Sequence, residues 1–185
     1  MSTLGEQIME ELKANDVKFY VTVPDSLTRP LWSQFDEKEK DIKLIKVCHE
    51  AEAVAVGAGI QMGGSNCVVV MENAGFFQAI EALRALPIDM KIPLVMLVSW
   101  VGRLRDNQSA DDVLELEVAK RGGAATHIAL QGALTEPLVR TLDIPYATLE
   151  GPEGVSLISW AFRKAHETRR PVAVLLDSLE TVRYF

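Results

Sequence analysis

Short runs of consecutive apolar residues recur along the chain, and helix-like patterns separate them. Two of these runs, Cys67–Met71 and Val172–Leu176, are apolar at every position. Such short apolar runs indicate strands that are buried on both faces. Four more strands are predicted over residues 19–23, 42–47, 94–99 and 146–149. Because strands alternate with helices, we expect an α/β three-layer sandwich, with a six-stranded, mostly parallel sheet covered by helices on both faces.

The predicted helices begin and end at recognisable residues. Thr3 to Glu6 reads as a capping box, and the helix after Glu50 is closed by Gly63 and Gly64. Pro137 is expected in the first turn of its helix. The predicted helices cover residues 4–12, 50–62, 113–119, 135–142 and 153–167, with a short one through 32 and another that follows a turn at 73–75 and ends near 86. The absence of repeats and linkers predicts a single domain over residues 1–185.

Composition narrows the classes of partner. The net charge of −7 argues against non-specific binding of nucleic acid, which needs a basic surface. The absence of an apolar run near the ~20 residues that span a bilayer argues against a membrane protein. The N-terminus does not resemble a signal peptide, so we expect a cytoplasmic protein. Cys48 and Cys67 both lie in apolar runs, and we expect both to be reduced core cysteines.

The unusual polar residues gather where the predicted strands end. In parallel sheets, ligands bind outside the carboxyl ends of the strands. Those ends are followed by Pro24–Ser26, Cys48–Glu50, Glu72–Gly75 and the residues from Trp100 onward. The sequence therefore predicts a site at this edge of the sheet.

Glu50 is the most unusual of these residues, because the helix that it begins is otherwise composed almost entirely of small and apolar residues. Burial there would disfavour the charged carboxylate and produce a proton donor that works near neutral pH. An acid in the first turn of a helix also simply complements the helix dipole. Glu52 faces roughly the other side of the helix, so the two carboxylates do not form an obvious acid/base pair. Both interpretations of Glu50 stay open on spacing alone.

A family resemblance adds to this pattern. Glu50, followed nine residues later by Gly59 with small residues between, resembles the pyrimidine-binding domain of thiamine-diphosphate enzymes. Val23–Ser26, Met71–Gly75 and Leu142–Tyr146 resemble the matching segments of phosphonopyruvate and sulfopyruvate decarboxylases. The resemblance covers roughly residues 5–100 and 132–177, and its strength lies in the order and spacing of the segments.

The resemblance implies roles for individual residues. Glu50 would hydrogen-bond the aminopyrimidine ring of thiamine diphosphate and take part in proton relay. The other implied cofactor contacts are Pro24, Asn73, Ala74, Gly75 and Phe76, and the implied substrate contacts are Asp25, Ser26, Arg103 and His127. A guanidinium fork such as that of Arg103 suits a phosphonate, sulfonate or carboxylate.

Each of these residues also has a plain structural interpretation. Residues 73–75 would form a strand-to-helix turn, Asp25 and Ser26 would cap a helix, and at least one of Phe76 and Phe77 would pack in the core. His49 is either a polar neighbour of the site or a satisfied structural histidine, and Arg103 and Arg105 would lie in a solvated loop. The sequence departs from the family pattern at Trp100–Arg103, and extra residues follow before His127.

The absence of a metal-binding motif indicates how the enzyme would be assembled from subunits. Enzymes of this family hold the diphosphate through Mg²⁺ with an Asp-Gly step and a later Asn, and no Asp-Gly dipeptide occurs in this chain. The resemblance therefore implies an alpha-type subunit of a hetero-oligomer. A beta-type subunit would supply the Mg²⁺ and diphosphate site, so that thiamine diphosphate lies between the two chains. The small-residue helix after Glu50 is also suited to close packing across a subunit interface.

The function expected from this resemblance is decarboxylation of a small anionic 2-keto acid, sulfopyruvate or phosphonopyruvate. An acetolactate-synthase-like carboligase subunit would keep the cofactor and change the reaction. A non-catalytic structural or regulatory partner would keep only the fold.

Overall fold

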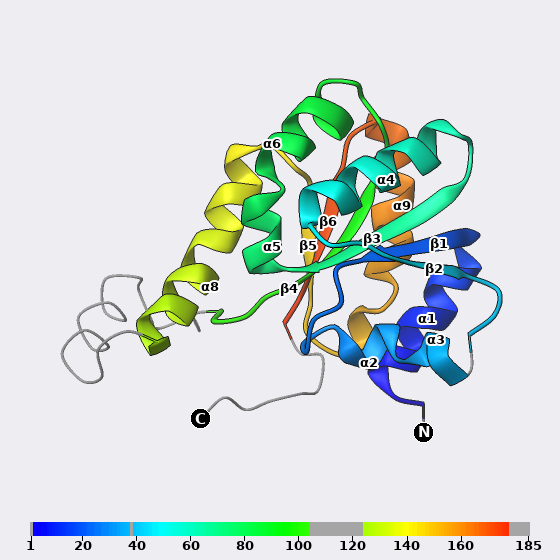
Figure 1. Ribbon diagram of the computed structural model, residues 1–185, viewed down its shortest axis with the longest axis horizontal. Coiled ribbons are helices and arrows are strands. Elements are labelled where there is room, and N and C mark those ends of the chain that lie inside the picture. The colour runs from blue at the N-terminus through cyan, green and yellow to red at the C-terminus, as the bar shows by residue number, and fades with distance from the viewer. Residues whose placement is uncertain (1, 38, 104–123, 178–185) are drawn as a thin grey trace.

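The computed structural model describes residues 2–37, 39–103 and 124–177, and within residues 36–37 and 124–127 it places only the backbone. Six strands form one sheet in the order β2-β1-β3-β4-β6-β5 (Figure 1). The strands are β1 (Val17–Thr22), β2 (Lys43–Lys46), β3 (Asn66–Glu72), β4 (Val95–Ser99), β5 (Tyr146–Leu149) and β6 (Val172–Leu176). Every neighbouring pair is parallel, which confirms the predicted sheet and extends it from mostly to wholly parallel.

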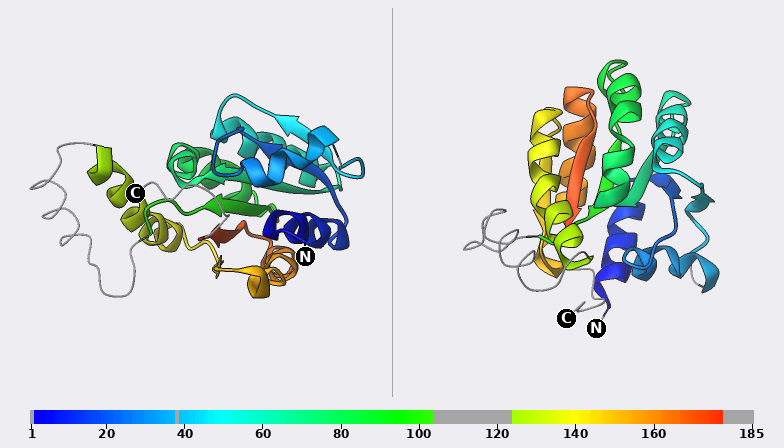
Figure 2. Two further views of the ribbon diagram at one scale, coloured as in Figure 1. Left: turned by 90° about the horizontal axis from the view of Figure 1, so that it is seen from below. Right: turned by 60° about the vertical axis from the view of Figure 1, so that its left-hand side comes forward.

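Helices cover both faces of the sheet, as the views in Figure 2 show. One face carries α1 (Leu4–Ala14), α2 (Arg29–Trp32) and α9 (Leu157–Thr168). The other face carries α4 (Glu50–Met62), α5 (Asn73–Gln78), α6 (Ile80–Leu83) and α8 (Ala124–Thr141). The shorter elements are α3 (Gln34–Glu37), a π-helical turn η1 (Arg84–Ile88) and a 3-10 turn η2 (Pro152–Gly154).

The period of two in the strands produces two separate cores. Val68 and Val70 face α1 and α9, whereas Val69 and Met71 face α4 and α5, and all four are at most 1% exposed. Full burial of each such side chain contributes roughly 1.5–3 kcal/mol. A strand that contributes to both cores must be apolar throughout, which is the pattern that predicted β3 and β6.

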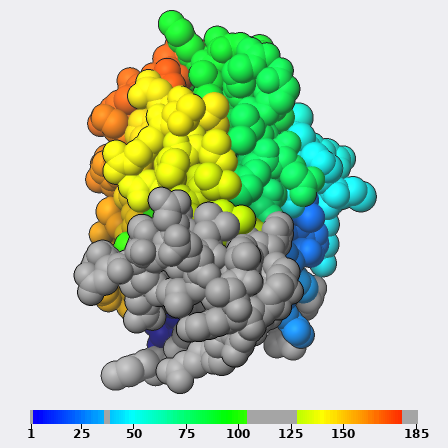
Figure 3. Space-filling model, turned by 90° about the vertical axis from the view of Figure 1, so that its left-hand side faces the viewer, coloured from blue at the N-terminus to red at the C-terminus, as the bar shows by residue number. Residues whose placement is uncertain are grey.

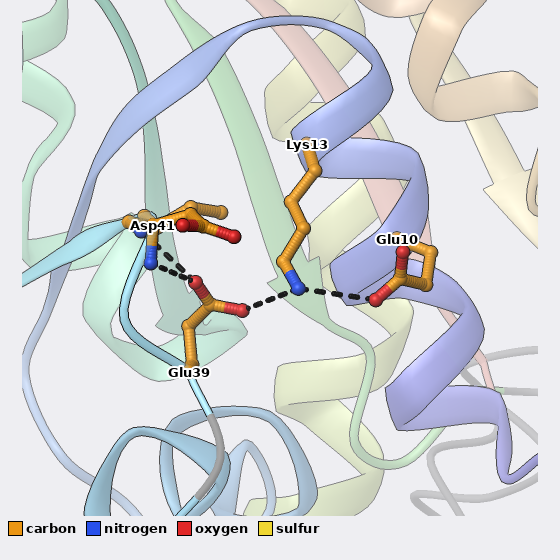
Figure 4. A network of polar contacts seen from close by, with 5 residues as sticks. Glu10, Lys13, Glu39 and Asp41 are labelled. Carbon is orange, nitrogen blue, oxygen red and sulfur yellow. Dashed lines mark hydrogen bonds and ion pairs between the residues drawn. The ribbon is translucent and has the colours of Figure 1, made fainter.

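An ion-pair network ties α1 to the segment that enters β2 (Figure 4). Glu39 is buried, and its carboxylate accepts hydrogen bonds from the backbone N–H groups of Asp41 and Ile42 at 2.6 and 2.9 Å. Lys13 pairs with Glu39 at 2.8 Å and with the exposed Glu10 at 3.1 Å. Burial raises the pKa of Glu39, but Lys13 and the two amides lower it more, so the pKa lies below its ordinary value.

Several local predictions differ from the structure. Residues 73–75 form the first turn of α5 and not a separate tight turn. The helix predicted from Thr135 begins at Ala124, so that Pro137 lies inside α8 and not in its first turn. The predicted helix at 113–119 lies outside the described residues. The capping box at Thr3 and Glu6 is present as predicted.

The two cysteines have different environments. Cys67 is fully buried, its Sγ donates to the carbonyl of Gly57 at 3.3 Å, and burial raises the pKa of its thiol to about 12. Cys48 is exposed at the end of β2, so the prediction of two core cysteines is wrong for Cys48. Strand β2 ends at Lys46, two residues earlier, so Cys48 lies beyond the part of the chain that packs in the sheet. Both thiols are free.

None of the helices in the described parts of the chain has the length and apolar character needed to cross a bilayer.

Candidate active site

The parallel sheet brings the predicted site residues to one edge. Because every strand runs in the same direction, the segments that follow β1, β2, β3 and β4 all begin at the carboxyl edge. Those segments carry Pro24–Ser26, His49–Glu50, Asn73–Phe76 and Trp100–Arg103. The chain reaches β2 and β3 on opposite sides of β1, and such a reversal of strand order is a usual place for a ligand crevice.

Glu50 and Gly75 are in direct contact at this edge. A Cβ placed on Gly75 would overlap Cγ, Cδ and Oε1 of Glu50, so the glutamate side chain lies flat against the glycine backbone. Gly75 is buried, whereas Glu50 is half-buried and less enclosed than the sequence suggested. Glycine at position 75 is therefore required for Glu50 to keep this place.

The residues next to Glu50 accept hydrogen bonds from backbone N–H groups at the beginning of α4. His49 is the N-cap residue, and its Nδ1 accepts the N–H of Ala51 at 3.2 Å. Glu52 accepts the N–H of Cys48 at 3.0 Å. His49 thus has the structural role that was one of its two interpretations. Within the described residues, no donor contacts the Glu50 carboxylate, so this group remains available at the edge.

Asp25 stabilises the turn after β1. Its Oδ1 accepts the N–H groups of Leu27 and Thr28 at 2.7 and 2.8 Å, and its Oδ2 accepts the Thr28 hydroxyl at 2.6 Å. The carbonyl of Asp25 also accepts the indole N–H of Trp32 at 2.9 Å. These bonds give Asp25 the turn-capping role that was its structural interpretation. Pro24 and Ser26 on either side are exposed.

Asn73 is buried, and its side-chain amide is hydrogen-bonded to other groups of the protein. Its Nδ2 donates to the carbonyl of Val101 at 3.0 Å and to the hydroxyl of Thr135 at 2.8 Å. Its Oδ1 accepts from Gln131 Nε2 at 2.5 Å. Asn73 thus joins α5 to α8, and Figure 3 shows the two regions in green and yellow side by side. Gln131 and Thr135 were not predicted as site residues, because the helix was predicted to begin at Thr135 and Gln131, one turn earlier, lay outside it.

Residues 74–77 differ in how far their side chains are exposed. Phe76 is fully buried in the core beneath α5, and its ring meets that of Phe77 edge-on at 6.4 Å. Ala74 and Phe77 are half-buried. Of the two aromatic rings, that of Phe77 is therefore the one with an accessible surface, and Phe76 contributes its side chain to packing.

Arg103 already has anionic partners. Its Nη1 lies 2.7 Å from Glu150 and 2.8 Å from Asp177, which follow β5 and β6. Its guanidinium stacks on Trp100 at 4.9 Å. Burial lowers the pKa of Arg103, but the two carboxylates raise it more, so it lies above its ordinary value. An anionic substrate would have to compete with both carboxylates for this side chain.

Two predicted groups cannot be placed. The backbone of His127 lies in α8, but its side chain lies outside the described part of the structure. Arg105 falls within 104–123, which is also outside it. Among the residues that the structure does describe, no group of three or more His, Cys, Asp or Glu side chains is arranged to hold a metal ion.

The comparisons with known proteins agree on one family. The family described as "Thiamine pyrophosphate enzyme, N-terminal TPP binding domain" matches residues 2–119. The chain is 28% identical to sulfopyruvate decarboxylase subunit alpha of Methanococcus maripaludis over 95% of each chain. It is 26% identical to the same subunit of Methanocaldococcus jannaschii, over 93% of this chain and 92% of that one.

Two longer proteins contain a region similar to this chain. Sulfopyruvate decarboxylase of Methanosarcina acetivorans is 26% identical over 93% of this chain but only 39% of its own length. The crystal structure of benzoylformate decarboxylase from Polynucleobacter necessarius superposes with a TM-score of 0.67 at 20% identity, over 96% of this chain and 30% of that one. The likeness to benzoylformate decarboxylase establishes a shared fold. This chain spans about a third of that larger protein.

Proposed function

Since this chain belongs to the thiamine pyrophosphate enzymes and carries their N-terminal TPP binding domain, we propose that it is the alpha-type subunit of a thiamine-diphosphate-dependent 2-keto acid decarboxylase. Sulfopyruvate is the proposed substrate, and phosphonopyruvate, which carries a similar anionic group, is the second. The observation that carries the proposal is the match along nearly the whole chain to alpha subunits of sulfopyruvate decarboxylase.

The residues at the carboxyl edge fit the pyrimidine end of the cofactor. A planar nitrogen heterocycle needs a hydrogen-bonding carboxyl group beside a flat surface. Glu50 supplies the carboxyl group, and its side chain can rest on the backbone of Gly75 because no Cβ stands there. The half-buried Ala74 and Phe77 follow in the same helix, and the exposed Pro24 lies at the same edge of the sheet after β1; these residues are the proposed surface for the ring.

The cofactor, when bound, supplies the carbanion chemistry of decarboxylation. The role of Glu50 in this proposal is to hold and exchange a proton at its carboxyl group with the ring nitrogen. The remaining residues orient the ring and exclude water. Asn73 acts in this scheme through the placement of the first turn of α5, because its amide is committed to Val101, Thr135 and Gln131.

The other end of the cofactor is assigned to a partner chain. The relatives are named as alpha subunits, which implies a second subunit. Most of the longer Methanosarcina protein lies outside the region that matches this chain, so it has room for a further domain. We propose that a beta-type subunit brings Mg²⁺ and the diphosphate site.

The exposed side of α4 is the proposed contact with that subunit. Ala55, Gly59 and Met62 follow one another on the same face, and Met62 is 64% exposed. A Cβ on Gly59 would have no atom within 4 Å. This face also carries the exposed Glu52 at its start, and its small residues would let a partner helix pack closely against it. Its position on the helix that begins at Glu50 would place the partner near the site.

The test is co-expression with a candidate beta chain that carries the Asp-Gly and Asn motif. Release of CO₂ from sulfopyruvate, phosphonopyruvate and pyruvate would be measured with thiamine diphosphate and Mg²⁺. We expect Glu50→Gln to lower kcat by about 100-fold or more, because the amide keeps the shape but cannot exchange the proton.

Glu52→Gln is the matched control, since an amide oxygen can still accept the N–H of Cys48. It is expected to retain nearly full activity. Near-full activity of Glu50→Gln would overturn the assigned role. Formation of a carbon–carbon bond with an added aldehyde, in preference to simple decarboxylation, would overturn the proposed reaction in favour of a carboligase.

A further inference from the structure

A buried polar network fixes the beginning of α5. Gln131 Nε2 donates to Asn73 Oδ1 at 2.5 Å and to Glu72 Oε1 at 3.0 Å. The hydroxyl of Thr135 accepts from Asn73 Nδ2 and donates to the carbonyl of Gln131 at 2.8 Å. Since Gln131 and Thr135 are one turn apart, they lie on the same face of α8.

These groups are enclosed. Asn73 and Thr135 are 0% exposed, and Gln131 is 7% exposed. A buried amide or hydroxyl that loses its partner keeps its desolvation cost, so such a network favours a single arrangement of its members. Its members come from β3, α5 and α8, and from the loop after β4 through the carbonyl of Val101.

The loop after β4 is held against α8 by separate contacts. The indole N–H of Trp100 donates to the carbonyl of Gly132 at 2.8 Å. A Cβ on Gly132 would collide with the carbonyl of Gly102, so the two backbones touch. Helix α8 thus contacts the loop after β4 at Gly132, within one turn of the residues that bond to Asn73.

The network leads to the candidate catalytic group through a short path. Asn73 and Gly75 belong to the same first turn of α5. The Glu50 side chain rests on Gly75 without space for an extra carbon. A displacement of this turn would therefore displace the surface that determines where the Glu50 carboxyl group lies.

We infer that Gln131 and Thr135 are positioning residues, which place Glu50 for proton exchange through Asn73 and Gly75. The inference rests on the proposed function of Glu50. Neither residue touches Glu50, and their effect passes through the first turn of α5. If the network were purely structural, its loss would lower stability and loosen α5 without a change in kcat. If it positions Glu50, its loss lowers kcat as well.

Thr135→Val tests the inference, because valine keeps the shape and removes the hydroxyl. Thr141→Val is the matched control: its hydroxyl likewise donates to a carbonyl four residues earlier in α8, that of Pro137 at 2.8 Å, but on the exposed side. In the complex with the beta chain, we expect kcat of Thr135→Val to fall about 10- to 100-fold, as for a modest misplacement of a reacting group. The substrate KM should change little, and Thr141→Val should behave as the unaltered protein.

A second readout needs no activity. In this chain alone, amide hydrogen exchange at residues 77–79 is expected to accelerate about tenfold in Thr135→Val and to stay unchanged in Thr141→Val. Thr135→Ser restores the hydroxyl and should restore both readouts. Gln131→Met, which removes the amide but keeps the length, should reproduce the effect of Thr135→Val.

The outcomes separate the two proposals. An unchanged kcat in Thr135→Val, even if the variant is less stable to heat or exchanges faster at 77–79, would overturn the positioning role. If no complex decarboxylates any of the tested keto acids, the proposed function fails. The exchange comparison would then still decide whether the network holds α5.

Discussion

At the scale of the residue, the position of Glu50 at the carboxyl edge depends on residue 75 being a glycine, which has no side chain. Glu50 rests on Gly75, and the neighbouring His49 and Glu52 are engaged in capping α4. Arg103 and Asp25 at the same edge are likewise committed to protein partners. Among these charged side chains, Glu50 is thus the one that the described structure leaves available for a ligand.

Gly75→Ala is expected to separate activity from stability. The three atoms nearest to the added methyl group all belong to the flexible Glu50 side chain, which can move aside, and alanine favours the helix by about 0.5–1 kcal/mol. We therefore expect unchanged or higher resistance to urea, with a fall in kcat of about 10-fold or more in the complex. Unfolding curves and CO₂ release would be measured on the same preparations.

Gly59→Ala in the isolated chain is the reference for the helix effect, because a Cβ there meets nothing within 4 Å. It should stabilise α4 by about 0.5–1 kcal/mol. Full activity of Gly75→Ala would show that Glu50 tolerates displacement, contrary to the role assigned to this contact.

The sequence identified the residues at this edge better than it identified their contacts. The position of these residues was predicted from the ends of the apolar runs, and the role proposed for Glu50 comes from the family resemblance. Cys48 was misplaced because strand β2 ends two residues before it. Gln131 and Thr135 carry a usable signal, since their spacing of four puts two polar groups on one helix face. That signal is visible only once the helix is known to extend back to Ala124.

At the scale of the element, helix boundaries were the least predictable feature. Proline at 137 suggested a helix start, but α8 continues through it. Proline lacks an N–H and normally interrupts a helix, so the bonds of α8 to Asn73 and Trp100 help to hold this helix in place. Pro87 lies similarly within η1, where a π-turn accommodates it. Tertiary contacts of this kind cannot be read from a local pattern.

The connection between α1 and β2 supports a prediction on stability. Glu39→Gln should lower the free energy of unfolding at pH 7 by about 1–3 kcal/mol, because a buried charged hydrogen-bond partner of Lys13 is lost. The pKa of Glu39 is lowered by folding, so its charge stabilises the protein above the unfolded-state pKa, which is ordinarily about 4.3. That contribution is lost as the pH falls through the lower, folded-state pKa.

Denaturant titrations at several pH values would check this. The difference between the unaltered protein and Glu39→Gln should shrink as the solution is acidified. Glu10→Gln removes the exposed carboxylate that pairs with the same lysine and should change stability by less than about 1 kcal/mol. Equal losses from the two variants would contradict the importance given to the buried pair.

At the scale of the whole molecule, the six strands and the covering of both faces were predicted correctly. No order of strands was predicted, because the order depends on which neighbour each crossover reaches, and local sequence does not encode that choice. The family match supports a thiamine pyrophosphate binding domain, and the proposal places one half of the cofactor site at its carboxyl edge.

The proposed division of the site predicts how binding depends on assembly. This chain alone should bind thiamine diphosphate weakly, with little effect of Mg²⁺, because the proposal assigns the diphosphate ligands to the partner chain. Addition of the beta chain should tighten binding by about 100-fold or more, equivalent to about 2.7 kcal/mol. Calorimetric titrations of each chain and of the mixture would measure this. Tight, Mg²⁺-dependent binding by the single chain would contradict the division.

The two edge strands of the sheet affect how readily this chain would aggregate on its own. The outermost strands, β2 and β5, each have only four residues, and β2 places exposed Lys43 and Lys46 at its two ends. Short, lysine-bearing edges resist the strand-to-strand joining that leads to aggregation. Growth of the sheet into a neighbouring molecule is therefore disfavoured, and association is directed instead to the faces of the helices.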